Sequence, residues 1–407
     1  MIDGAGLPLT GAFQELRDTL IWAFGVIDPI QERALFALSK LQSTDPALAA
    51  SVAALPWVSD GVTELESGAL EHLVKLSGVD AELASQVSAE PWASGDITVD
   101  EWQALKYLSM LAQKGSSLGR TAAGFFWIED GVVEEEWRAL EFLYGIAESE
   151  SQLAGRVLAF PWMSSELSEE GRRALQYLKD ITNQDVSLGL QIGNYPWLED
   201  GVTDDERWAL RYLKDITVAD PDMGINIASL PWMSDDMTAG ERGALRYLKD
   251  FHAAEPELAS NVAVMPFLST SFQDHDETAL YALSFLQSNF PDDLAFMVSQ
   301  DWYLDGLSDE EASFVTTLGR EDQFISPPDL RDLVEAHHVQ SRQISLPISG
   351  DITLTFIQAA PDEGNADIVR QVEEAIVEIE EFIGVPFPTA EVILLFASGN
   401  APIFQSD

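Results

Sequence analysis

Several bases and tyrosines in the middle of the chain are spaced so that they could bind a ligand together. The segments RRALQYLKD, RWALRYLKD and RGALRYLKD follow one another at a constant interval. Arg207, Arg211 and Lys214 are spaced i, i+4 and i+7, so they lie on one face of a helix. Because the chain has only 22 Lys and Arg, their gathering here predicts a polar groove for an acidic or mixed-charge peptide. The candidate groove residues are Tyr177, Lys179, Arg207, Arg211, Tyr212, Lys214, Arg242, Arg246, Tyr247 and Lys249.

A second interpretation of these bases is that they neutralise nearby acidic side chains. An aspartate directly follows each lysine, at Asp180, Asp215 and Asp250. The chain contains 69 Asp and Glu, and the density of acids around the three segments favours this interpretation. The sequence leaves both interpretations open.

Two other patterns resemble metal sites but lack the required spacing. Asp60-Gly61 and its equivalents are somewhat like calcium loops, but an EF-hand has its bidentate Glu at a fixed position after the Gly. Glu66 lies one residue too close to Gly61 for that role, and a turn followed by a helix cap explains the residues. His337 and His338 are adjacent and would face different directions on a helix. The sequence therefore predicts no metal site and no cofactor.

The chain has no recognisable catalytic motif. It has no cysteine, which excludes thiol catalysis, disulfides and Cys-ligated zinc. It also has no Gly-rich phosphate loop and no Gly-x-Ser-x-Gly elbow. The acids are too numerous to single out a glycosidase pair. The sequence therefore predicts no catalytic residues.

The elements that position these residues follow from a 35-residue repeat. Large aromatic residues occur at this period, and most follow a proline. A binding site seldom needs a residue in every repeat, whereas a packing interface does, so we expect these side chains to pack between repeats. They are Trp22, Trp57, Trp92, Trp127, Trp162, Trp197, Trp232, Phe267 and Trp302.

Each repeat is predicted to contain two helices and a Pro-Trp loop. An Ala-Leu pair and a further Leu recur in register, as at Ala69, Leu70 and Leu73, and they share one helix face. A Thr, Ser or Asp precedes this helix in most repeats, and five repeats have a Glu three residues later, which is a capping box. A second, shorter helix ends near the next Pro-Trp, where proline disfavours further helix.

The sequence therefore predicts a mainly α fold, an α-α superhelix (solenoid) of nine helix-turn-helix repeats, with a small C-terminal α/β segment. The architecture resembles TPR-like or HEAT-like arrays, although the Trp-Leu-Gly-Tyr pattern of tetratricopeptide repeats is absent. We expect the solenoid at residues 1–325, a linker helix within 326–342 that covers Asp329 to His338, and a partial α/β domain at 343–407. In this domain we expect a hairpin of strands at 344–346 and 352–356, a helix at 368–382 and a strand at 391–397.

The run LPISGDITLTFIQ, followed by IEEFIGVPFPTAEVILLFA, resembles the opening of a gluzincin-type zinc peptidase domain. The resemblance spans about residues 343–399. It implies a small sheet and a helix, followed in such domains by a later His-Glu-x-x-His helix. None of the 5 histidines has that spacing, and the sequence stops at Asp407. No catalytic residue is assigned, and zinc is expected only if this is the N-terminal portion of a longer metallopeptidase.

The charge balance limits the classes of partner. A net charge of −47 disfavours nucleic acid, since phosphate binding needs a basic surface, and it repels anionic membranes. No apolar run is long enough to span a bilayer, and the N-terminus lacks the pattern of a secretory signal. We expect a soluble protein, cytoplasmic or, if the N-terminus is incomplete, extracellular. The expected function is a non-catalytic scaffold for a protein or peptide; the alternative is a peptidase fragment without its catalytic region.

Overall fold

The computed structural model describes most residues from Leu20 to Val264 and several shorter segments after them. The described residues are 20–24, 27–129, 131–165 and 167–264, scattered positions from 268 to 298, then 338–348, 350–358, parts of 370–382, 391–396 and 403–406. They belong to two compact units: unit 1 is Met1–Ala228 with Ser234–Asp236, and unit 2 is Ser229–Met233 with Met237–Asp407. The expected boundary at residue 325 lies outside the described residues.

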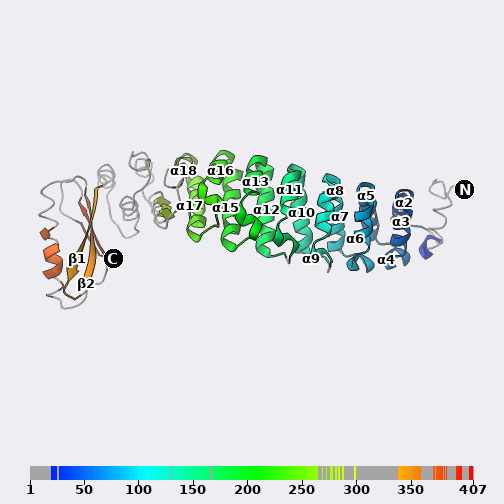
Figure 1. Ribbon diagram of the computed structural model, residues 1–407, viewed down its shortest axis with the longest axis horizontal. Helices are drawn as coiled ribbons and strands as arrows, with labels where there is room; N and C mark the ends of the chain where they lie inside the picture. The colour runs from blue at the N-terminus through cyan, green and yellow to red at the C-terminus, as the bar shows by residue number, and fades with distance from the viewer. Residues whose placement is uncertain are drawn as a thin grey trace. The chain divides into compact units, whose positions relative to one another are not determined.

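The long helices of unit 1 have the same length and begin at a constant interval. They are α2 (Pro29–Thr44), α5 (Glu64–Val79), α7 (Val99–Lys114), α10 (Glu134–Ser149), α12 (Glu169–Gln184) and α15 (Asp204–Ala219), each of 16 residues. Within unit 1, consecutive long helices of this series pack against one another (Figure 1). The mainly α repeat array expected from the sequence is therefore present in unit 1.

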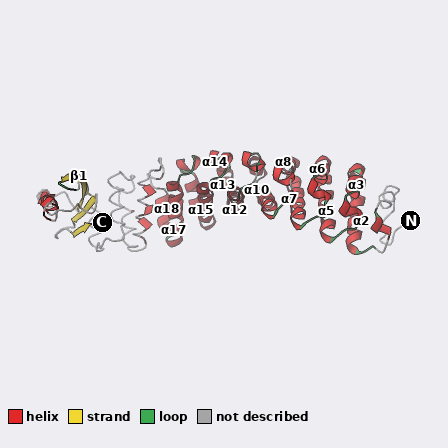
Figure 2. Cartoon of the chain, turned by 90° about the horizontal axis from the view of Figure 1, so that it is seen from below, coloured by secondary structure: helices red, strands yellow, loops and turns green. Residues whose placement is uncertain are grey.

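A short helix follows each long one and forms a second layer in unit 1 (Figure 2). These helices are α3 (Pro46–Ala53), α6 (Ala81–Ser88), α8 (Ser116–Ala123), α11 (Ser151–Leu158), α13 (Val186–Ile192) and α16 (Pro221–Ala228). A single residue joins the two helices of a repeat. Asp45, for example, donates its amide to Leu41 O at 2.7 Å and caps Ala47 N and Leu48 N at 3.0 Å. One residue thus ends the first helix through its backbone amide and begins the second through its side chain.

The segments around the periodic tryptophans form single helical turns, not the loops expected from the sequence, and five of these turns begin with proline. They are η1 (Ile21–Phe24), α4 (Pro56–Ser59), η2 (Pro91–Ser94), α9 (Phe126–Glu129), η3 (Pro161–Ser164), α14 (Pro196–Asp200) and η4 (Pro231–Ser234). Proline at the first position of a helix has a fixed φ that suits the helix, and its missing N–H costs nothing there. The proline that ends one short helix therefore begins the next turn.

Indole hydrogen bonds connect successive repeats. Trp57 Nε1 donates to Ala93 O at 2.7 Å, and Trp127 Nε1 donates to Met163 O at 2.8 Å. Equivalent bonds run from Trp22 to Val58 O, from Trp162 to Leu198 O and, in unit 2, from Trp232 to Leu268 O. The donor always lies one repeat before the acceptor, so these side chains pack between repeats. Phe267 and Trp302 lie outside the described residues.

Capping boxes begin the long helices where the sequence places them. The Thr hydroxyl and the Glu carboxylate bond each other's backbone amides at Thr63 with Glu66, Thr98 with Glu101, Thr203 with Glu206 and, in unit 2, Thr238 with Glu241. Behind these caps the alanine column is buried, with Ala34, Ala69, Ala104, Ala139, Ala174 and Ala209 each at most 1 % exposed. The pair Ser308 and Glu311 lies outside the described residues.

The described part of unit 2 contains one further helix pair and a sheet. The helices are α17 (Ala239–Ala254) and α18 (Pro256–Ala263). The strands β1 (His338–Leu346), β2 (Gly350–Gln358), β3 (Glu391–Phe396) and β4 (Ile403–Ser406) form a sheet in the order β1-β2-β3-β4. β1 and β2 are antiparallel, β2 and β3 parallel, and β3 and β4 antiparallel. Helical residues between 370 and 382 lie in the crossover that a parallel pair requires.

Two features of this segment differ from the expectations. β1 begins at His338, so residues 338–342 belong to a strand and not to the expected linker helix. The reason is pairing: Val339 and Ser341 lie opposite Ile357 and Thr355 of β2, a contact that helix periodicity cannot reveal. β4 was not expected, because its four residues are too few for a visible alternation.

Candidate functional site

The lysines of the predicted groove are paired with acids on their own helices. Lys179 Nζ lies 3.5 Å from Asp180 Oδ1, and Lys214 Nζ lies 2.5 Å from Asp215 Oδ1. In unit 2, Lys249 makes the same pair with Asp250 at 3.1 Å. These contacts are the neutralisation that the second interpretation of the sequence describes.

Arg207 is buried and therefore does not line a groove, which corrects its place among the candidate residues. It is 7 % exposed and donates through Nε and Nη2 to Asp204. Its Nη1 is buried without a hydrogen-bond partner. The guanidinium groups of Arg207 and Arg211 each lie 4.6 Å from the centre of the Trp208 ring. Both arginines therefore pack against the Trp208 ring. The spacing of the charges along the helix does not predict this contact.

The candidate tyrosines also contact neighbouring side chains. Lys214 Nζ lies 5.9 Å from the centre of the Tyr177 ring, and Tyr212 stacks on Trp208 at 5.7 Å. In unit 2, Arg246 donates to the Tyr247 hydroxyl at 2.8 Å, and Arg242 belongs to the same helix, α17. The predicted groove residues are thus divided between the two units, and each unit uses them in its own packing.

These tyrosines belong to a column of rings that pack between consecutive long helices. The column comprises His72, Tyr107, Phe142, Tyr177, Tyr212 and Tyr247. Tyr107 donates its hydroxyl to Glu141 Oε1 of α10 at 2.8 Å, and Lys179 Nζ of α12 lies 5.4 Å from the Phe142 ring centre. Both of these contacts run from one long helix to the next, whereas the stacking of Tyr212 on Trp208 stays within α15.

The first described long helix has no ring in this column. In α2 the column position is occupied by Ala37. The residues of α5 at the positions that contact the rings in later repeats are Glu71 and Val74. Glu71 corresponds to Glu141, which accepts the Tyr107 hydroxyl. Val74 corresponds to Ser109, Lys179 and Lys214, which contact the rings of His72, Phe142 and Tyr177. Ala37 is itself 2 % exposed, and its methyl group supplies no ring to make the contacts of the later repeats.

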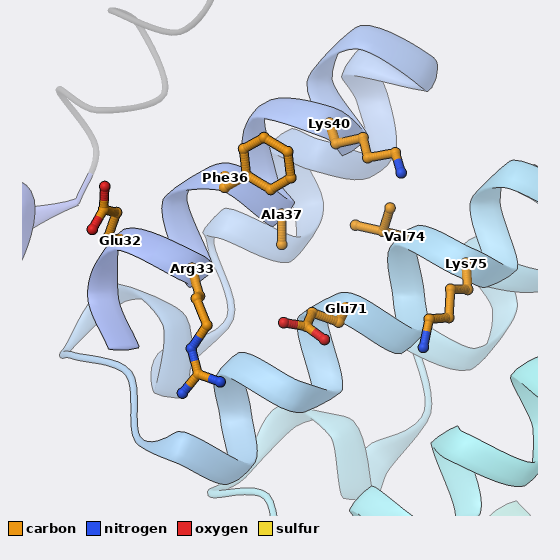
Figure 3. A pocket seen from close by; sticks show the side chains of 8 residues that line it. All are labelled: Glu32, Arg33, Phe36, Ala37, Lys40, Glu71, Val74 and Lys75. Carbon is orange, nitrogen blue, oxygen red and sulfur yellow. The ribbon is translucent and has the colours of Figure 1, made fainter. Parts of the chain in front are cut away.

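A cavity lies between α2 and α5 at this position (Figure 3). Its volume is about 510 Å³, and its lining residues are Glu32, Arg33, Phe36, Ala37, Lys40, Glu71, Val74 and Lys75. Phe36 is 54 % exposed, so its ring is accessible from solvent. In Figure 3, Ala37 points from α2 toward α5, with Phe36 and Val74 on either side. The cavity therefore combines an apolar floor with an accessible ring.

Charged groups without partners border the cavity. Within the described part of the chain, neither Lys40 nor Lys75 has a carboxylate within ion-pair distance, and neither Glu32 nor Glu71 has a basic partner. Arg33 is different, because it forms a 3.5 Å pair with Glu64. In a chain with 69 acids and 22 Lys and Arg, a lysine without an acidic partner can bind an anionic group from outside.

The sequence signal for this cavity is a local departure from the repeat, not a motif. Two adjacent positions depart from their columns here. Phe36 stands where later repeats of unit 1 have polar residues (Glu71, Lys106, Glu141, Gln176 and Arg211), and Ala37 stands where they have rings. A search for departures from the repeat would have found both residues. A search for enriched residue types found the paired bases.

Comparisons with known proteins give this chain no family. No family model matches it, and neither a curated protein nor a solved structure matches it. The resemblance of residues 343–399 to a peptidase domain gains no support from these comparisons. Among the residues that the structure describes, no group of three or more His, Asp or Glu could hold a metal ion. No helix in the same part of the chain is long and apolar enough to cross a membrane.

Proposed function

We propose that this protein is a non-catalytic scaffold that binds a protein or peptide, and that the α2–α5 cavity is a contact site. The observation that supports this function is the vacant ring position at Ala37 beside the exposed ring of Phe36. An unfilled cavity costs the fold its packing contacts, so a partner side chain that enters it gains contacts that the other repeats already make internally.

The chemistry of the lining favours binding over catalysis. Phe36, Ala37 and Val74 offer apolar contact, and Lys40 and Lys75 offer charge. Binding sites of this size are typically apolar with a few polar groups that fix orientation. A partly exposed aromatic ring in a pocket is also the kind of residue that dominates binding energies at protein interfaces.

Selection of random peptides displayed on phage tests this function on the full chain. We expect peptides to be enriched on the wild type and to lose binding when Ala37→Tyr fills the cavity with the side chain that the later repeats have. Phe36→Ala should weaken the same peptides by removing the exposed ring. Circular dichroism and thermal unfolding check that both variants keep the fold.

The matched control is Phe126→Ala, because Phe126 of α9 is 58 % exposed but lies outside the cavity. It should leave the selected peptides bound. If no peptide is enriched, or if enriched peptides bind the Ala37→Tyr variant as well as the wild type, the cavity is not the binding site. The peptidase alternative and its zinc stay predictions that the described residues and the comparisons do not test.

A further inference from the structure

We infer that the α2–α5 cavity takes a tyrosine side chain of a partner protein, with an acidic residue next to it in the partner's sequence. This inference rests on the proposed binding function and specifies its ligand. In effect, the partner would supply the ring that the column lacks at Ala37. The closing experiment separates the two ideas, because a peptide can bind the chain without using tyrosine.

The internal rings show how a ring fits between two long helices. Tyr107 of α7 is 7 % exposed, stacks parallel to Trp137 of α10 with centroids 6.1 Å apart, and donates to Glu141. At the α2–α5 interface Ala37 takes the place of that ring, and it lines the cavity together with Phe36 and Val74. A ring from a partner would therefore contact apolar groups on both helices, as aromatic pairs favour.

Glu71 favours tyrosine over phenylalanine. It occupies the position of Glu141, whose carboxylate accepts the Tyr107 hydroxyl at 2.8 Å. Burial and Glu141 hold the pKa of Tyr107 above its usual range, so that hydroxyl stays protonated and donates. The Glu71 carboxylate lines the cavity and, within the described residues, has no basic partner. A partner tyrosine can make the same hydrogen bond there, and a phenylalanine cannot.

Lys40 and Lys75 favour an acidic residue beside the tyrosine. Both line the cavity, one from each helix, and each lies four residues beyond Phe36 or Glu71 along its helix. They therefore lie one helical turn further toward the C-terminal ends of α2 and α5. Figure 3 shows both side chains on the same side of the cavity. A carboxylate next to the bound ring would meet two ammonium groups that have no acid of their own among the described residues.

Titrations with four short peptides test the inference. Binding is monitored by saturation-transfer difference NMR, which detects weak complexes. The probe is Gly-Ser-Tyr-Glu-Ser-Gly, and the companions replace Tyr by Phe, Tyr by Ala, or Glu by Gln. On the full wild-type chain, we expect Phe to weaken binding about fivefold, the effect of one hydrogen bond. Ala should abolish detectable binding, and Gln should weaken it about threefold, as for an exposed ion pair.

Variants of the protein then remove, one at a time, the side chains proposed to contact the Tyr and the Glu of the peptide. On Glu71→Ala, the Tyr and Phe peptides should bind equally well. On the double variant Lys40→Gln with Lys75→Gln, the Glu and Gln peptides should bind equally well. Lys114→Gln is the matched control, because Lys114 pairs with Glu148 at 3.9 Å outside the cavity, and it should preserve the preference for Glu.

The outcomes separate the inference from the proposed function. If the Tyr, Phe and Ala peptides bind equally, or if Ala37→Tyr leaves the Tyr peptide bound, the tyrosine inference is wrong. Phage selection can nonetheless yield peptides that lack tyrosine and that bind the wild type but not the Ala37→Tyr variant. In that case the cavity is a binding site for another side chain. If selection also yields nothing, both proposals fall.

Discussion

His72 shows how the ring column turns a titratable side chain into a packing element. Its Nδ1 lies 3.1 Å from Ser109 Oγ, and the Ser109 hydroxyl donates to Lys106 O at 2.7 Å. Because that hydroxyl proton is engaged, Ser109 accepts from His72, and Nδ1 has the ring proton. Burial first, and then Lys75 and Lys106, lower the pKa of His72 from 6.5 to about 4. The imidazole is therefore neutral in the folded protein at ordinary pH.

The protein should lose stability as the pH falls from about 6.5 to about 4 because of this one residue. The unfolded chain takes up a proton at His72 near pH 6.5, whereas the folded chain resists it until about pH 4. The pKa shift corresponds to about 3 kcal/mol. That loss is absent above the unfolded pKa and complete below the folded one.

The measurement is urea unfolding of the wild type and His72→Gln between pH 7 and 4. The glutamine keeps a neutral donor near Ser109 and removes the titration. The stability difference between the two proteins should therefore shift in favour of the variant as the pH falls. Parallel curves over this range would show that His72 does not control acid stability.

At the scale of the elements, hydrogen bonds from tryptophan indoles to backbone carbonyls connect consecutive repeats. Trp57 and Trp127 are 2 % and 3 % exposed, and each bonds a carbonyl of the following repeat. Trp92 is equally buried at 6 % exposed, yet its Nε1 has no hydrogen-bond partner. A comparison of Trp127 with Trp92 therefore separates the contribution of the indole hydrogen bond to stability from that of ring packing.

Trp127→Phe should therefore destabilise the protein more than Trp92→Phe, by about 1–2 kcal/mol. Both substitutions remove part of an indole, but only the first also leaves a buried carbonyl, Met163 O, without its donor. Urea unfolding followed by circular dichroism gives the comparison. Equal losses for the two variants would mean that the indole bond adds nothing beyond ring packing.

The start of α10 is the weakest cap among the described long helices of unit 1. Val133 occupies the cap position and has no oxygen for the helix amides, so only the Glu136 half of the box is present, with Val133 N donating to Glu136 Oε2 at 2.8 Å. Val133 is 53 % exposed, so a polar side chain meets no obstacle there.

Val133→Thr should raise the stability by about 1 kcal/mol, because a threonine hydroxyl can accept from the N3 amide. The reverse change Thr98→Val, at an intact capping box, should lower the stability by a similar amount. Thermal unfolding of the two variants gives both values. A neutral result for Val133→Thr, with a loss for Thr98→Val, would show that the α10 start is held by other contacts.

The sequence predicted the helices well because their signals are local and repeated. The caps at Thr63 and Thr98 and the buried alanine column follow from residue types at fixed spacing. The site could not be predicted in the same way. Arg207 is held by Trp208 and Asp204, and the cavity comes from a side chain that is missing at Ala37. Both depend on which residues of one repeat lie against the next.

At the scale of the whole molecule, the acidic composition opposes folding. The net charge of −47 means that compacting the chain brings like charges together. Many of the described ion pairs are exposed, such as Arg33 with Glu64, whose side chains are 50 % and 78 % exposed. Exposed pairs contribute little to stability, so repulsion should outweigh them.

Added salt should therefore stabilise this protein. Raising NaCl from about 10 mM to about 1 M shortens the screening length from about 30 Å to about 3 Å, which weakens repulsion between distant acids. The free energy of unfolding in urea should rise over this range, and KCl should act alike because screening does not depend on the ion. A fall in stability with salt would show that ion pairs, not repulsion, dominate.

The indole bond between consecutive repeats has a consequence for how such a gene can change. Where the bond is present among the described repeats, its donor and acceptor lie in consecutive repeats, so these repeats present the same receiving carbonyl and the same donor ring. Duplication or loss of one period of 35 codons would join surfaces that already fit. Recombination between the similar repeats could therefore lengthen or shorten the array in single steps, while a repeat that departs from its neighbours, like that of Ala37, acquires a role of its own.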